Sequence, residues 1–273
     1  MKLFANKKNV ILFAAVFFIV ILTLIFIGPG KESTLCHNNV QDHGETGIDC
    51  GGACDASCHE VKRLETKKTF IINSGNQKNS GLAVLVKNPN DLYGLSNFSY
   101  DIIGYDENSE EVVRGDGQSY ILPKQEKYLS ILGIDETLID RIISVSIEMQ
   151  KESWNKFSQF TDPNLFVINK KFEDAGESLI VVGSGRLANN SAYNVGEINI
   201  VAVIFDEKGG LRALTSTNIN DIESGERRDF KVSWVVDRQN GDRLEMFPET
   251  DVFQESGFAG EFGLEEVLVR YVN

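Results

Sequence analysis

Hydrophobic and polar positions divide the chain into three parts. Residues 9–30 contain no charged side chain, and most of them are aliphatic or aromatic. A helix of ~20 such residues crosses a bilayer core of ~30 Å, so this segment predicts a transmembrane anchor. Residues 31–68 follow no apolar period. Beyond residue 69, short apolar runs alternate with polar positions and turn residues, which is the pattern of β-strands.

Lysines on the amino side of the anchor predict its orientation. Lys2, Lys7 and Lys8 precede it and no acidic residue does, and positive flanks stay on the cytoplasmic side. We therefore expect a single-pass protein of the cell membrane, with its N-terminus cytoplasmic, its C-terminal domains extracytoplasmic and the lipid bilayer as one partner. A cleaved signal peptide is the alternative, but its apolar core is shorter, ~7–15 residues.

The region after the linker reads as β structure throughout. Leu82, Val84 and Val86 occupy alternate positions, and the polar run from Asn88 then breaks the strand. Residues 198–205 are apolar on both faces, which predicts a central, covered strand. Short strands with regular turn signals over about a hundred residues are typical of immunoglobulin-like sandwiches. The predicted fold class is all-β.

Three apolar segments recur in the same order about a hundred residues later, which indicates a domain-sized duplication. Phe70–Asn73 returns as Phe166–Asn169, Ile103–Glu107 as Val203–Glu207, and Ile121–Glu126 as Ile222–Glu226. The predicted organisation is a cytoplasmic tail (1–8), the anchor (9–30), a cysteine-rich stalk (31–59), a linker (60–68), sandwich 1 (69–150), an inter-domain segment (151–164) and sandwich 2 (165–273).

All cysteines and histidines lie close together after the anchor. The cysteines are Cys36, Cys50, Cys54 and Cys58. An even number in an exported segment predicts two disulfides, whose pairing the sequence leaves open. Zinc is the less favoured alternative, because the histidines lie among the thiols but the spacing differs from that of the common zinc fingers.

Oxygen-bearing side chains crowd the same segment. Asp42, Glu45 and Asp49 stand at short spacings around glycine turns, as ligands of a hard cation such as calcium do. The spacing of an EF-hand is absent. The plainer alternative is a polar turn in which the carboxylates bind backbone amides. We expect no obligatory cofactor, with calcium as the open candidate.

The cysteine segment resembles a short motif of exported bacterial and archaeal surface proteins, which usually reads C-x-N-G-V-x-D…E-T-D-V-D-C-G-G-x-C-x-x-C. The matching stretches are Cys36–Asp42 and Glu45–Cys58. This chain departs from the motif at Asn39, where glycine is usual, and its last cysteine spacing is one residue longer. The resemblance implies an extracytoplasmic, disulfide-linked stalk and no particular chemistry.

The second β copy resembles the FxLYD-type immunoglobulin-like domain. The residues that carry this resemblance are Leu179–Ser191, Val203–Gly209, Ile222–Glu226 and Phe230. In the first copy, Asn88-Pro89-Asn90 is similar to relatives of the late-embryogenesis-abundant type. These families are envelope and surface modules, so the resemblance implies a fold and a compartment, and it implies little about activity.

Charge and residue types narrow the function. The chain carries a net charge of −13, which argues against a nucleic-acid partner. No histidine follows His59, so the sandwiches lack a Ser–His or Cys–His pair. We therefore predict a non-catalytic envelope scaffold that presents its sandwiches to an unknown envelope protein or polymer. The alternatives are a metal-responsive module and a carboxylate-based hydrolase.

Aromatic residues near the domain joints are candidate contact residues. Trp154 and Phe157 lie in the inter-domain segment, and Phe253 and Phe258 lie in a late stretch rich in acids and glycines. Packing between the sandwiches is the plainer explanation for them. Exposed anchors for a partner are the alternative, because exposed aromatic side chains favour interfaces.

Overall fold

The computed structural model describes residues 34–38, 40–42, 44–75, 77–174, 180–236 and 239–272. The chain forms two compact units, residues 1–58 and residues 59–273, which we call the stalk unit and the sandwich unit. The predicted tail (1–8) and anchor (9–30) lie outside the described residues. Within the described ranges, no helix is both long and apolar enough to cross a membrane.

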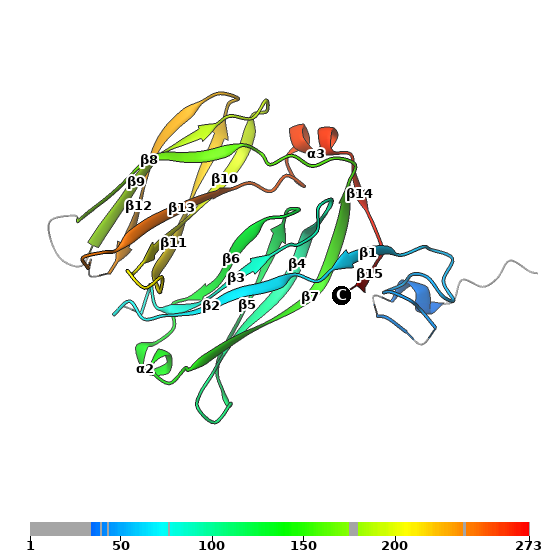
Figure 1. Ribbon diagram of the computed structural model, residues 1–273, viewed down its shortest axis with the longest axis horizontal. Coiled ribbons are helices and arrows are strands. Elements are labelled where there is room, and N and C mark those ends of the chain that lie inside the picture. The colour runs from blue at the N-terminus through cyan, green and yellow to red at the C-terminus, as the bar shows by residue number, and fades with distance from the viewer. Residues whose placement is uncertain are drawn as a thin grey trace, which may run out of the picture. The chain divides into compact units, whose positions relative to one another are not determined.

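The sandwich unit is built almost entirely of β-strands, which confirms the all-β prediction (Figure 1). The strands are β1 (His59–Lys62), β2 (Glu65–Ile72), β3 (Gly81–Lys87), β4 (Tyr93–Tyr105), β5 (Glu111–Ile121), β6 (Glu126–Leu132), β7 (Ser144–Phe157), β8 (Leu165–Asp174), β9 (Ile180–Asn189), β10 (Val195–Phe205), β11 (Leu211–Ile222), β12 (Arg227–Val235), β13 (Arg243–Glu249), β14 (Leu264–Glu266) and β15 (Val269–Val272). Two short helices accompany them, α2 (Glu136–Ile139) and α3 (Ser256–Phe262), and the stalk unit holds the 3₁₀ turn η1 (Thr34–His37).

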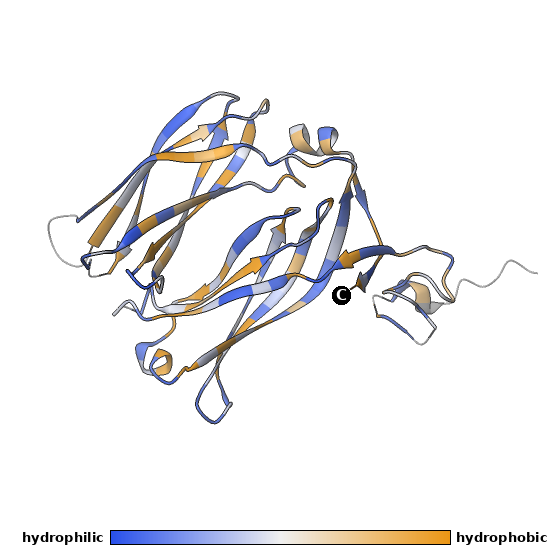
Figure 2. Cartoon of the chain, viewed as in Figure 1, coloured by the Kyte–Doolittle hydropathy of each residue, from blue (hydrophilic) through white to orange (hydrophobic). Residues whose placement is uncertain are grey.

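Two sandwiches account for most of these strands. In sandwich 1, the sheet β14-β7-β4-β5 packs against the sheet β2-β3-β6 around a core that includes Val84, Phe98 and Trp154. In sandwich 2, the sheet β11-β10-β13 packs against β12-β9-β8 around Leu187 and Trp234. Apolar and polar residues alternate along the strands in both (Figure 2), because successive side chains of a strand point to opposite faces.

The two sandwiches repeat one strand order. Sheet β2-β3-β6 corresponds to β8-β9-β12, and β7-β4-β5 corresponds to β13-β10-β11. The pairing nevertheless corrects one part of the sequence alignment. Phe70 lies opposite Ala83, several residues before Asn88, whereas Phe166 lies opposite Ala188, directly before Asn189. The two phenylalanines are therefore not equivalent, because the register of a strand is set by its pairing rather than by its own apolar pattern.

Domain boundaries in the structure differ from those predicted. Strand β7 continues to Phe157, well into the predicted inter-domain segment 151–164. The C-terminal part of the predicted range 165–273 does not stay with sandwich 2, because β14 pairs with β7 and β15 pairs in parallel with β1. Such long-range pairing leaves no mark in the local pattern of the sequence.

A third apolar cluster joins the sandwiches into one unit. It lies between the outer face of β2-β3-β6 and the outer face of β11-β10-β13. Phe70 and Phe205 meet there with ring centroids 6.4 Å apart, and Tyr128 and Phe247 meet at 5.6 Å. Each sandwich thus has an apolar outer face as well as an apolar interior, and the two outer faces cover each other.

Candidate functional site

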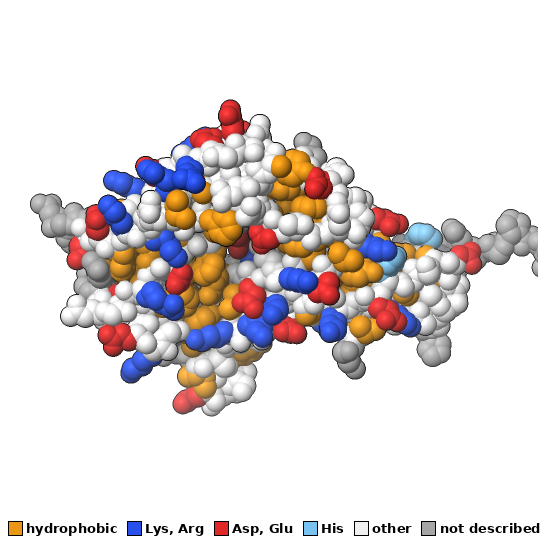
Figure 3. Space-filling view, turned by 45° about the horizontal axis from the view of Figure 1, so that its top comes forward, with side chains coloured by type: hydrophobic (Ala, Val, Ile, Leu, Met, Phe, Trp, Pro, Cys, Tyr) orange, Lys and Arg blue, Asp and Glu red, His pale blue; other side chains and the backbone are white. Residues whose placement is uncertain are grey.

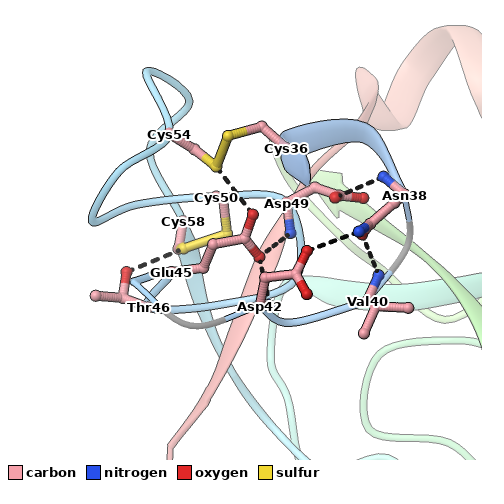
Figure 4. Close-up of a disulfide and its surroundings, with 10 residues drawn as sticks. All are labelled: Cys36, Asn38, Val40, Asp42, Glu45, Thr46, Asp49, Cys50, Cys54 and Cys58. Atoms are coloured by element: carbon pink, nitrogen blue, oxygen red, sulfur yellow. Dashed lines mark hydrogen bonds between the residues drawn. A yellow bond between two sulfur atoms is a disulfide. The ribbon is translucent and has the colours of Figure 1, made fainter. Parts of the chain in front are cut away.

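The stalk unit contains the two predicted disulfides (Figure 4). Cys36 is bonded to Cys54 and Cys50 to Cys58, which closes loops with sequence separations of 18 and 8 residues. This alternating connectivity is one of the three that the sequence left open. The bonds occupy all four sulfur atoms, so this oxidised segment offers no thiolate for zinc.

The three predicted calcium ligands lie together but bind the chain itself. Glu45 Oε2 accepts hydrogen bonds from the backbone N–H groups of Asp42 (3.1 Å) and Asp49 (3.2 Å). The side chains of Asp42 and Asp49 accept in turn from the side-chain amide and the backbone N–H of Asn38, at 2.7 Å and 2.9 Å (Figure 4). These carboxylates therefore hold the loop in the way the plainer alternative described.

Glu45 also lies near Cys36 and Cys54, the one group of potential metal ligands found among the described residues. Both sulfurs belong to the same disulfide, so the group does not form a thiolate site. Steric constraints explain the second glycine of the Gly51-Gly52 pair in the motif. Gly52 has φ +62°, and a Cβ there would lie 1.9 Å from the carbonyl oxygen of Gly44, a position that only glycine fits.

The four candidate aromatic residues pack inside the sandwich unit. Trp154, Phe157 and Phe258 are buried, and Phe253 is half-buried. The ring of Phe157 contacts that of Phe253 at a centroid distance of 5.5 Å, which fastens the C-terminal stretch onto β7. Trp154 donates its indole N–H to Glu152 and to the hydroxyl of Tyr271. These residues join segments within the chain, and they form no exposed anchor.

The sequence did not point to the cleft that lies between the two sandwiches. Its volume is about 800 Å³. The lining residues are Ser96, Asn97, Gln118, Ser119, Tyr120, Gly196, Glu197, Asn199, Asn220, Asp221, Glu249, Asp251, Gln254 and Glu255. Five of them are acidic and none is basic, so the cleft is negatively charged and rich in amides.

Glu249, one of the lining residues, belongs to a buried ion pair. Lys127 of sandwich 1 and Glu249 of sandwich 2 lie 3.0 Å apart, with 8% and 4% of their side chains exposed. The ammonium group of Lys127 also lies over the ring of Tyr120, 3.5 Å from its centroid. Burial raises the pKa of Glu249 although Lys127 opposes that shift, and burial also raises the pKa of the Tyr120 hydroxyl.

The remaining acids of the cleft differ in their surroundings. Glu255 Oε1 accepts from the backbone N–H groups of Gly196 (3.0 Å) and Glu197 (3.1 Å), which fastens the C-terminal stretch to β10. Asp251 is half-buried, and burial raises the pKa of its carboxyl group. Asp221 is exposed at the rim. Three of the five acids, Glu249, Asp251 and Glu255, come from the late stretch that the sequence shows to be rich in acids. Glu197 and Asp221 lie far from it in the chain, so no motif joins all five.

The solved structures compared with this chain resemble it only distantly. No protein-family model and no curated protein matches the chain. A red sea bream transglutaminase structure is 13% identical over 78% of this chain and 32% of that one, with a TM-score of 0.25. The calcium-binding domain CBD12 of CALX1.1 is 12% identical over 69% of this chain and 80% of that one, with a TM-score of 0.22.

A β-glucuronidase structure from Bacteroides uniformis is 13% identical over 67% of this chain and 24% of that one, with a TM-score of 0.25. This chain spans about a third or less of the length of the transglutaminase and of the glucuronidase. At such identities and TM-scores, these likenesses say nothing about activity. The described residues thus form two β-sandwiches, preceded in the sequence by a disulfide-bonded segment.

Proposed function

We propose that this chain is a non-catalytic envelope protein, anchored by residues 9–30, whose sandwich unit binds a positively charged segment of another envelope protein in the cleft between the sandwiches. The acidic cleft carries this proposal. Its walls come from both sandwiches, five carboxylates line it, and no lysine or arginine does. A surface of one sign attracts a partner of the opposite sign and orients it.

The joined sandwiches favour binding rather than catalysis. The apolar cluster between them and the buried Lys127–Glu249 pair hold the cleft walls in place, so little ordering is needed when a partner binds. His59, the histidine of the sandwich unit, shares a hydrogen bond with the hydroxyl of Tyr93 rather than with a serine, so it does not form an activated nucleophile of the Ser–His type. The disulfide-bonded stalk suits an oxidising compartment, which supports an extracytoplasmic location. The resemblance of sandwich 2 to FxLYD-type surface domains supports the same compartment.

Peptide binding tests the cleft directly. The full-length protein in non-ionic detergent is titrated into a fluorescent peptide of alternating Lys and Gly and, separately, into a Ser–Gly peptide of equal length. We expect saturable binding of the lysine peptide alone. Neutralising two cleft acids with Glu197→Gln and Asp221→Asn should weaken binding about tenfold, equivalent to ~1.4 kcal/mol.

A control variant has the same net charge as the cleft double variant. Glu107→Gln combined with Glu110→Gln removes two exposed acids outside the cleft and should leave the affinity within about twofold. If both double variants weaken binding equally, the peptide responds to overall charge and the cleft is not the site. Absence of any binding at low salt would also overturn the proposal.

A carboxylate-based hydrolase is the second candidate, and Asp251 is the observation that favours it. Its carboxyl group lies in the acidic cleft and has a raised pKa, as a general acid of a glycosidase does. Release of reducing sugar from a panel of envelope polysaccharides, abolished by Asp251→Asn, would support this candidate against the binding role. No turnover with any member of the panel would leave the binding role as the better explanation.

A further inference from the structure

The interface between the sandwiches uses two particular sheet faces, one from each sandwich. Sandwich 1 contributes the outer face of β2-β3-β6, and sandwich 2 contributes the outer face of β11-β10-β13. The two sandwiches share one strand order. The sheet β8-β9-β12 of sandwich 2 is therefore the counterpart of β2-β3-β6, and the sheet β5-β4-β7 of sandwich 1 is the counterpart of β11-β10-β13. Those two counterpart faces lie away from the interface, and their residues can be compared position by position.

The counterpart in sandwich 2 is basic. We align the two sandwiches on Asn88 and Asn189, so that Ala83 corresponds to Ser184. On the neighbouring strand, Phe70 lies opposite Ala83 and Lys171 lies opposite Ser184. In the same way Ser130 corresponds to Lys231. Leu85 corresponds to Arg186 and Tyr128 to Asp229.

A groove of about 710 Å³ runs over this part of sandwich 2. The charged residues that line it are Lys170, Lys171, Arg186, Lys231 and Asp229. We call these five the basic face. Lysine and arginine side chains gather in Figure 3 toward the left of the view, the side on which Figure 1 places β8, β9 and β12.

The counterpart in sandwich 1 is acidic. Asp101 stands the same number of residues before the turn residue Asp106 as Val201 stands before Asp206. Glu148 lies opposite Asp101 as Phe247 lies opposite Val201.

Four acidic residues and one cationic residue lie on this face, and three of the carboxylates pair with the cation. Arg114 bonds Asp101 (3.1 Å), Glu111 (2.8 Å) and Glu148 (3.1 Å), and Asp116 lies opposite Asp101 on β5. We call these five residues the acidic face.

We propose that the basic face of one copy packs on the acidic face of the next copy, in the arrangement that joins the two sandwiches within one chain. The occupant is therefore a second copy of this chain. Such a contact joins two different faces, so it propagates head to tail. Its charges are exposed and of opposite sign, so the association is predicted to weaken steeply with salt.

Charge complementarity supports a second copy over other occupants. The basic face has four cationic side chains against one anionic one, on a chain whose net charge is −13. The acidic face has four carboxylates and one cation. The sheets that carry these two faces correspond in strand order to the sheets that already pack against each other inside the chain. A charged terminal face also serves some repeat proteins as a cap that prevents further stacking.

Sedimentation velocity of the full-length protein in non-ionic detergent tests this proposal. At low salt, we expect the average mass to rise with protein concentration in steps of one protomer. The apparent association constant should fall at least tenfold between 50 and 300 mM salt. A monomer at every concentration would overturn the proposal and support the capping role.

Charge reversal identifies the faces. Lys171→Glu with Lys231→Glu reverses the basic face, and Asp101→Lys with Glu148→Lys reverses the acidic face. Each double variant alone should remain monomeric. An equimolar mixture of the two should associate again, because each reversed face then meets a reversed partner. Mere unfolding of the variants could not produce this rescue.

A control and a competing ligand complete the experiment. Lys62→Glu with Lys208→Glu changes the net charge by the same amount at exposed lysines that belong to neither face, and association should persist. If association is lost in this control as well, or survives in both reversed variants, the faces are not the contact. A polyglutamate probe that binds the basic face of a strictly monomeric protein would also overturn self-association and would assign the face to an anionic polymer.

Discussion

Asn88 and Asn189 occupy the same position in the two sandwiches and make the same hydrogen bonds. Both are fully buried. The side-chain amide of Asn88 donates to the carbonyls of Tyr93 (2.7 Å) and Leu122 (2.9 Å). That of Asn189 donates to the carbonyls of Tyr193 (2.8 Å) and Glu223 (3.1 Å). Each asparagine therefore ties the loop after one strand to the turn between two others.

Replacing either asparagine by alanine should destabilise the sandwich unit. Asn88→Ala and Asn189→Ala each remove two side-chain hydrogen bonds to backbone carbonyls, and one such bond contributes about 0.5–1.5 kcal/mol. We expect a loss of about 1–3 kcal/mol in the free energy of unfolding, measured by urea denaturation. Asn108→Ala, at an exposed turn position, should change stability by less than about 0.5 kcal/mol. A loss as small as that at Asn88 would contradict this account.

The turns that these asparagines reach contain a second matched pair. Lys124 has φ +60° and its counterpart Gly225 has φ +78°. Because only glycine adopts this conformation without cost, Lys124→Gly should stabilise the protein by about 0.5–1 kcal/mol, and Gly225→Lys should destabilise it by a similar amount.

Thermal unfolding of both variants checks the signs. Lys124→Ala is the control, because it removes the surface ion pair with Asp91 but keeps the steric cost of a Cβ. A destabilising Lys124→Gly, with Lys124→Ala equal to it, would assign the effect to the ion pair.

The pair Lys127–Glu249 should behave as a buried ion pair. Lys127→Met or Glu249→Leu alone leaves one charge without its partner and should cost about 3–5 kcal/mol. The double variant Lys127→Met with Glu249→Leu should recover most of that loss, because it removes both buried charges together. Urea unfolding of the four proteins gives the coupling free energy. Additive losses would show that the two groups do not act as a pair.

The raised pKa of Asp251 predicts a pH dependence of stability. A carboxyl group with a higher pKa in the folded state favours the protonated form, so its contribution is fully present below the unfolded pKa of about 4 and is lost as pH rises through the folded pKa. The Asp251→Asn variant lacks this loss. Its unfolding midpoint, relative to that of the natural protein, should therefore rise between pH 4 and pH 7. A constant difference across that range would contradict burial as the cause.

Reducing the disulfides should affect the stalk unit alone. Loops of 18 and 8 residues correspond to about 3 and about 2.5 kcal/mol of unfolded-state restriction. We expect endoproteinase Glu-C, which cuts after glutamate, to cleave at Glu45 after reduction and not before, as read by mass spectrometry. The unfolding midpoint of the sandwich unit should not move, because all four cysteines lie in the stalk unit. A shift in that midpoint would contradict the independence of the two units.

Strands, disulfides and turns could be predicted from the sequence, because they depend on residues close together in the chain. Alternating apolar residues such as Leu82, Val84 and Val86 identify a strand and its buried side, because the period of a strand is fixed by backbone geometry. The even number of cysteines predicted two disulfides. The polar break at Asn88 marked a turn, although its buried amide bonds were not foreseen.

The sequence by itself thus determined the β class, the duplication and the disulfide-bonded stalk. Only the tertiary structure decided which faces meet. Phe70 and Phe166 look alike in the sequence, yet one lies in the interface and the other is exposed, because strand register and sheet packing place them differently. The acidic cleft arises in the same way. Glu197 and Gln118 line the same cleft only because the two sandwiches pack against each other, and no local pattern records that contact.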